Sequence, residues 1–299
     1  MSNLYTQQSS NITKTWLFLA FFLVLVIAIG FVFAQALGNP TILYAAVGLA
    51  LILNVGSYWY SDKLVLGISK AKPADEQVYI ELHRIVENLA ITAGLPKPRV
   101  YVMQEPQPNA FATGRDPKHA VIAVTTGLID VLDRKELEGV IAHELAHIGN
   151  RDMLLTTVVV VLAGFISILS DMFLRWQFYG GHHRSSSKGG NQAAGIFMII
   201  ALVLAIIGPL LALLIRLAIS RKREFLADAS GAMLTRYPEG LASALQKISA
   251  YPQTARVATK PTASLFIANP FRGKRLSALF MTHPPIEERV KALLDNVKE

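Results

Sequence analysis

The chain contains no cysteine. Disulfide bonds are therefore excluded, and any metal site must be built from histidine and carboxylate side chains rather than thiolates. The absence also fits a reducing compartment. Charged residues are scarce too, at 17% of the chain, whereas 52% of residues are hydrophobic and the mean hydropathy is +0.39. Such a chain either embeds long segments in a membrane or disperses its apolar residues, and their arrangement decides between the two.

The apolar residues gather in four runs. These runs cover residues 16–33, 42–60, 153–174 and 195–215. Only the third run holds a charged residue, Asp171. A helix needs about 20 apolar residues to cross a bilayer, and a buried core helix would show a polar face that these runs lack. We therefore expect a hairpin of two transmembrane helices at 16–60 and a second pair at 153–215, joined by the polar loop 175–194.

Basic residues follow the second and fourth runs, and the net charge is +8. They are Lys63, Lys70, Lys72, Arg216, Arg221, Lys222 and Arg223. Their placement indicates a cytoplasmic location for residues 61 onward, by the positive-inside rule, and attraction to anionic lipid headgroups. No nucleic-acid-binding motif is present, so the bilayer is the expected partner and nucleic acid is not. The loop 175–194 is also basic, which leaves open a tilted or incomplete insertion of the last two runs.

The N-terminal residues 1–15 are polar, and we expect them to form a short loose tail. The small residues around Gln35 resemble a signal-peptidase site, Ala34-Gln35-Ala36. However, the apolar run before them is longer than the core of an ordinary signal peptide. We therefore favour an uncleaved membrane anchor.

Two water-soluble segments, 61–152 and 216–299, are expected to form the halves of one domain. In the first, the elements predicted from periodicity and turn residues are a helix at 75–95, strands at 99–103, 109–113 and 120–124, and a helix at about 134–150. Asp133 and Glu136 have the spacing of a capping box at the start of that last helix. In the second, Pro238 and the pair Pro284-Pro285 each open a helix. The predicted fold is mostly α with a small β-sheet, combined with multi-pass membrane helices.

The predicted helix at 134–150 carries the motif His143-Glu144-Leu145-Ala146-His147. Residues i and i+4 share one face of a helix, so His143 and His147 can bind one Zn²⁺, and Glu144 can act on a metal-bound water. The alternative is two helix histidines with an incidental glutamate. That alternative would leave three polar side chains without a task in a strongly apolar helix. The motif therefore predicts a zinc-dependent hydrolase.

A catalytic zinc site needs a third protein ligand and one open position. His83 lies on an earlier amphipathic helix, and His182 and His183 lie in the loop between two predicted spans, on the wrong side of the membrane. Glu224 is the better candidate, because two crossings between His147 and Glu224 return the chain to the same side. The alternative for Glu224 is a surface acid that pairs with Arg221 or Lys222.

Several motifs together make the sequence similar to the HtpX-type heat-shock membrane proteases, which are related to the CAAX prenyl proteases. The resemblance covers nearly the whole chain. The motifs are the two leading spans, the segment 109–114, the H-E-x-x-H helix continued as 149–152, the pair Glu224 and Asp228, and the segment 282–284. It implies a gluzincin-like metalloprotease domain in which His143, His147 and Glu224 bind zinc.

The resemblance also implies roles for other residues. Asp228 would orient a ligand imidazole from behind. Asn109, Ala110, Phe111 and Ala112 would form an edge strand that pairs with an extended substrate; the alternative is ordinary sheet structure. His283 would donate a hydrogen bond to the oxyanion, although a helix-capping or loop histidine is an equal alternative.

The function implied is that of a zinc endopeptidase in the bacterial plasma membrane, with its active site facing the cytoplasm. Glu144 would activate the attacking water, and the substrates would be unfolded or damaged membrane proteins in quality control. A zinc-dependent scaffold without turnover is one competitor, but a scaffold needs no base such as Glu144. A transporter is another, but it would carry several charges within its spans. The natural substrates, the cleavage preference and the oligomeric state do not follow from the sequence.

Overall fold

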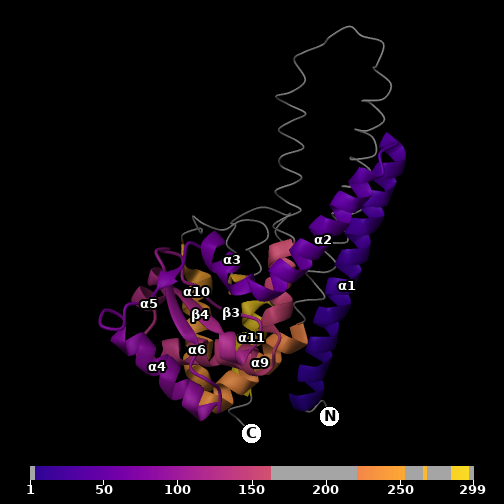
Figure 1. Cartoon of the computed structure of the whole chain (residues 1–299). Helices are drawn as coiled ribbons and strands as arrows, with labels where there is room; N and C mark the ends of the chain where they lie inside the picture. The colour runs from indigo at the N-terminus through magenta and orange to yellow at the C-terminus, as the bar shows by residue number, and fades with distance from the viewer. Residues whose placement is uncertain (1–3, 163–220, 253–264, 268–283, 296–299) are drawn as a thin grey trace.

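The computed structural model describes residues 4–162, 221–252, 265–267 and 284–295. Figure 1 shows two long helices beside a body that holds a small sheet and the remaining helices. This arrangement confirms the predicted mostly α fold with a small sheet. The fourth predicted span, most of the third, the loop 175–194 and His283 lie outside the described residues.

The two long helices are α1 (Leu4–Leu37) and α2 (Thr41–Trp59). Many of their large apolar side chains are exposed, among them Leu17, Val24, Tyr44 and Ile52. Within the described residues, two segments are long and apolar enough to cross a membrane, Ser9–Val32 and Thr41–Trp59. A third span is counted only if Arg134–Gly149 and Met153–Leu162, which meet at 87°, are taken as one bent span. The two candidate spans coincide with the two runs of the first predicted hairpin.

The N-terminal tail differs from the expectation, because α1 is already helical from Leu4. The polar first turns of α1 contact the domain that holds the sheet. The Asn11 amide donates a hydrogen bond to the backbone carbonyl of Asn150 over 3.1 Å, and both Asn11 and Thr15 are buried. The polar end of α1 therefore packs against the domain, and this contact explains why it is ordered as helix.

A short helix, α3 (Ser61–Ile68), follows α2 directly and was not predicted. It connects the hairpin to the sheet through an ion pair of 2.6 Å between Asp62 and Arg99. A second connection is the guanidinium of Arg115, which lies 4.8 Å from the centre of the Trp59 ring. The domain is thus held against the cytoplasmic end predicted for α2.

The sheet has four strands in the order β1-β2-β4-β3. They are β1 (Lys72–Pro73), β2 (Arg99–Met103), β3 (Ala110–Thr113) and β4 (Val121–Thr125). β2 and β4 run parallel, and the other two pairings are antiparallel. The three predicted strands are confirmed to within one residue, and β1 was missed because two residues carry no periodicity.

Strand β3 is an edge strand, and its register decides which backbone groups point outward. The N–H of Thr125 donates to the Asn109 carbonyl over 2.9 Å, and Phe111 lies opposite Ala123. Hydrogen bonding alternates along an antiparallel pair. Phe111 therefore bonds to β4, while Ala110 and Ala112 direct their N–H and C=O groups away from the sheet.

The helices that pack on the sheet are α4 (Ile80–Thr92), α5 (Thr126–Val131) and α6 (Arg134–Gly149). α4 begins five residues later than predicted, because the Asp75 carboxylate accepts from the N–H groups of Gln77 and Val78 and stabilises a turn instead. At α6 the predicted capping box is confirmed, with reciprocal hydrogen bonds between Asp133 and Glu136.

Three further helices cover α6 or lie near it: α9 (Arg221–Thr235), α10 (Pro238–Ala250) and α11 (Ile286–Asp295). The approach of α9 and α10 to α6 depends on glycine. A Cβ at Gly231 of α9 would lie 3.0 Å from the backbone nitrogen of His143. A Cβ at Gly139 of α6 would lie 2.8 Å from the backbone nitrogen of Leu241 in α10. These close contacts fix the helix that carries the H-E-x-x-H motif.

We expect Gly139→Ala to lower the free energy of unfolding by about 1–3 kcal/mol, because the added methyl group forces α6 and α10 apart. Gly67→Ala in α3 is the matched control, since nothing lies within 4 Å of the Cβ that it would add. The control should be neutral or stabilising by up to about 1 kcal/mol. Thermal unfolding in detergent, followed by circular dichroism, measures both. Equal stability of the two variants would contradict the close approach of α6 and α10.

Candidate metal centre

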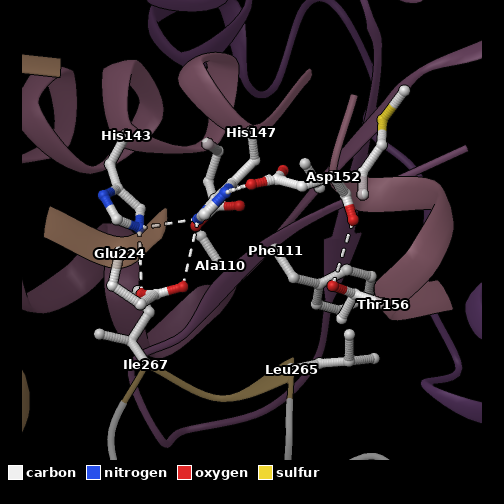
Figure 2. A pocket seen from close by; sticks show the side chains of 12 residues that line it. Ala110, Phe111, His143, His147, Asp152, Thr156, Glu224, Leu265 and Ile267 are labelled. Atoms are coloured by element: carbon white, nitrogen blue, oxygen red, sulfur yellow. Dashed lines mark hydrogen bonds and ion pairs between the residues drawn. The ribbon is translucent and has the colours of Figure 1, made fainter. Parts of the chain in front are cut away.

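Three side chains from two helices, α6 and α9, converge in the left half of Figure 2. His143 and His147 project from one face of α6, and their Nε2 atoms lie 3.1 Å apart. Glu224 enters from α9 and places its carboxylate oxygens 3.8 Å from His143 Nε2 and 3.7 Å from His147 Nε2. One ligand atom from each residue fits within 4.8 Å of the others. The structure therefore brings together the three predicted ligands.

The outer nitrogen of each imidazole is held by a carboxylate. His143 Nδ1 lies 2.9 Å from Asp228, and His147 Nδ1 lies 3.1 Å from Asp152. A carboxylate can only accept a hydrogen bond, so both Nδ1 atoms carry the proton. The two Nε2 lone pairs then face each other and the Glu224 carboxylate. A cation between these atoms would be attracted to all three, and the nitrogen and oxygen donors suit zinc among other divalent metals.

The electrostatic field of the site favours positive charge. Burial opposes protonation of His147, but the carboxylates of Asp152, Glu224 and Glu144 outweigh burial and raise its pKa to about 10. The acids that surround the imidazole would stabilise a metal cation in the same way.

Behind the histidines lies Arg289 of α11, whose side chain is 1% exposed. It binds Asp228 through two hydrogen bonds, of 2.8 Å from Nε and 2.6 Å from Nη2. Burial raises the pKa of Asp228, but hydrogen bonds from Arg289 and His143 outweigh it and lower the pKa to about 2. The Nη1 atom of Arg289 lies 3.7 Å from Glu224. Arg289 therefore compensates the charge of two acids that the metal cluster needs ionised.

A pocket opens beside the three ligands, and Glu144 lies on its wall. The remaining lining comes from β3, from Asp152 and the helix Met153–Leu162 that follows it, and from residues 265–267. The lining residues are Ala110, Phe111, Ala112, His143, Glu144, His147, Asp152, Met153, Thr156, Glu224, Leu265 and Ile267. Figure 2 shows Phe111 above Leu265 to the right of the cluster, and Ile267 below Glu224.

Asn109, predicted as a substrate-binding residue, is placed differently from its neighbours in β3. It is fully buried and is not part of the pocket lining. Its side-chain amide donates to the carbonyl of Leu265 over 3.1 Å, and its side-chain oxygen accepts from the N–H of Ile267 over 2.9 Å. The side chain thus binds the protein's own backbone.

Comparisons with known proteins agree with this geometry. The model of "Peptidase family M48" matches residues 76–297, which include all three converging ligands. The chain belongs to peptidase family M48. It is a metallopeptidase of that family, with a His-His-Glu metal site of the gluzincin type.

Relatives within M48 match the chain almost from end to end. A "Protease HtpX homolog" from Caldanaerobacter subterraneus subsp. tengcongensis is 51% identical over 293 residues, which cover 97% of each chain. Another, from Pyrococcus furiosus, is 47% identical over 283 residues and 94% of each chain. The crystal structure of S. mikatae Ste24p matches with a TM-score of 0.50 and 20% identity, over 94% of this chain and 67% of that one. The predicted resemblance is confirmed, and the likeness to Ste24p shows a shared fold.

Two residues near the M48 metal site had no predicted role. Asp152 lies five residues after His147, a spacing that fits no helical face. It reaches the imidazole because the chain bends by 87° after α6 and Arg151 takes a φ of 55°. The burial of Arg289, in contrast, could have been predicted from the sequence. Ile286, Arg289, Val290 and Leu293 have the spacing of one apolar helix face, so an arginine there indicates a buried charge.

Replacement of Arg289 by Met should lower the free energy of unfolding by about 3–5 kcal/mol, because the Asp228 carboxylate then stays buried without its cation. The double variant Arg289→Met/Asp228→Asn should regain most of this loss, since neither charge remains. Urea unfolding of the metal-free protein in detergent measures the cycle. A double variant as unstable as the single one would show that Arg289 acts by packing alone.

Proposed function

We propose that the chain is a membrane-embedded zinc endopeptidase that cleaves unfolded or damaged membrane proteins. The observation that carries the proposal is the shared pocket: Glu144, the three-ligand cluster and the outward edge of β3 line one space. A base, a metal site and a peptide-binding edge in one pocket are the parts that metal-assisted peptide hydrolysis requires.

Residues His143, His147 and Glu224 would hold the zinc ion. This donor set leaves a coordination position open, as catalytic zinc sites do. When bound, zinc supplies Lewis-acid activation of a water molecule and of the scissile carbonyl. Asp152 and Asp228 keep the two imidazoles in the tautomer that presents Nε2 to the metal.

Glu144 acts as the general base. Its side chain is buried, at 5% exposure, and lines the pocket one residue from the first ligand. It would take a proton from the attacking water and pass it to the leaving amine. His283, which lies outside the described residues, remains our candidate for a donor to the oxyanion.

Strand β3 would bind the substrate backbone. Ala110 and Ala112 direct their N–H and C=O groups away from β4, and both line the pocket. An extended peptide could therefore add to the sheet as a further strand. Backbone hydrogen bonds form with any extended peptide, whatever its side chains are. This mode of binding therefore suits a protease that cleaves unfolded chains of varied sequence.

Membrane substrates are supported by the position of the domain. Asn11 of α1 bonds to the end of α6, and Arg115 lies over Trp59 of α2, so the pocket is tied to the membrane hairpin. The basic residues after α2 favour a cytoplasmic location for this domain by the positive-inside rule. We infer a plasma-membrane enzyme that meets its substrates at the cytoplasmic side of the bilayer.

Glu144→Gln should retain zinc but lower kcat for an unfolded protein substrate by at least about 10²-fold, because the amide cannot accept the proton. Glu138→Gln is the matched control on the same helix, since the Glu138 side chain is 31% exposed and pairs with Arg134. Enzyme purified in detergent under chelator and reloaded with zinc provides the assay, with metal content measured alongside. Full turnover by the zinc-loaded Glu144→Gln enzyme would refute the role of Glu144.

A further inference from the structure

The segment Leu265–Ile267 is fixed in place by one side chain. The Asn109 amide accepts from the N–H of Ile267 and donates to the carbonyl of Leu265, over 2.9 and 3.1 Å. These are the two bonds that a neighbouring strand would offer to an extended backbone. Because Asn109 is fully buried, breaking either bond would leave a polar group unsatisfied, which costs about 1–3 kcal/mol. The segment is therefore firmly attached beside the start of β3.

The segment presents alternate side chains to the pocket. Leu265 and Ile267 line it and are 6% and 7% exposed, whereas Phe266 is more exposed and does not line it. Leu265 also packs in one apolar cluster with Phe111 of β3. The same two elements that Asn109 joins thus form adjoining walls of the pocket, as Figure 2 shows.

Away from the metal cluster, the described lining of the pocket is almost entirely apolar. Its residues there are Ala110, Phe111, Ala112, Met153, Thr156, Leu265 and Ile267. The polar member, Thr156, donates its hydroxyl to the Asp152 carbonyl of its own helix. Burying a charged substrate side chain against such walls is costly, whereas burying apolar CH₂ groups against them is favourable.

We propose that Leu265 and Ile267 form the wall of an apolar subsite that selects a large uncharged side chain, aliphatic or aromatic, next to the scissile bond. Asn109 is the positioning residue that holds this wall. The proposal rests on the proposed endopeptidase function and assigns its substrate preference. Backbone pairing to β3 would bind any extended chain, and this subsite would then choose the bond that is cut.

The first test uses zinc-loaded full-length enzyme in detergent and a set of internally quenched peptides. The peptides are identical except for one residue beside the cleaved bond, which is Leu, Phe, Ala, Asp or Lys, and mass spectrometry identifies the bond. We expect kcat/KM for Leu and Phe to exceed that for Ala by about 10-fold or more, and for Asp and Lys by about 100-fold. Equal cleavage of all five peptides would overturn the subsite.

Variants of the wall then assign the preference to its residues. Leu265→Ala should enlarge the subsite and raise the Phe-to-Leu ratio of kcat/KM several-fold, and Leu265→Lys should favour the Asp peptide. Leu155→Ala is the matched control, because Leu155 is 3% exposed in a different apolar cluster and does not line the pocket. The control should keep the wild-type ratios even if it lowers stability. Unchanged ratios in both Leu265 variants would refute the wall.

Asn109→Asp tests the positioning role with nearly the same shape. It keeps the acceptor for Ile267 but sets a carboxylate oxygen against the Leu265 carbonyl, so the wall should loosen. The Leu-to-Ala ratio of kcat/KM should fall towards one while bound zinc stays at one ion per chain. Faster cleavage of every peptide by the same factor would instead show that the segment covers the site, and would overturn the proposal. Zinc-loaded wild type that cleaves no peptide would overturn the proposed function and the subsite with it.

Discussion

Two imidazole Nε2 atoms and the Glu224 carboxylate face one another within about 4 Å in a buried site, where a positive charge between them, from a metal ion or from a proton on His147, is stabilised. The rest of the domain maintains that geometry. Asp152 and Asp228 turn the rings inward. The absence of a side chain at Gly231 lets α9 lie close to α6, so that Glu224 can join the two histidines. The fold therefore holds three donor atoms in the positions that a metal ion needs.

A second layer of charge stabilises the first. Four acids lie around the histidines, and the buried guanidinium of Arg289 compensates two of them, Asp228 and Glu224. Arg289 comes from the last described helix, so the site includes side chains from both halves of the protease domain. Burying an isolated cation of this kind would be prohibitive. The C-terminal helix is thus held in place by the same charges that the metal site requires.

The sequence predicted what depends on local periodicity or on counting membrane crossings. The H-E-x-x-H spacing predicted that two histidines share one helix face. The two membrane crossings counted between His147 and Glu224 predicted that Glu224 lies on the same side of the membrane as the histidines. The strand patterns predicted three strands. It missed Asp152, because a left-handed residue and a sharp bend bring it back to His147. It also missed the bonds between Asn109 and residues 265–267, since no pattern connects positions so far apart. The helical N-terminal turns were missed because a tertiary contact stabilises them.

The hydrogen bond from Asn11 to the Asn150 carbonyl has a consequence for how the molecule is divided. Further along α1, one apolar cluster joins this helix to the helix that follows α6. Its members are Phe18, Leu19 and Phe22 of α1 and Leu155, Val158, Val159 and Leu162 of the second helix. The membrane helix α1 and the protease domain therefore share buried packing, and α1 is part of the domain's structure as well as its membrane anchor. A fragment without α1 would expose the apolar side chains of the helix after α6 that α1 covers. Because that helix also lines the pocket, removing the membrane helices to gain solubility would disturb the active-site half of the domain.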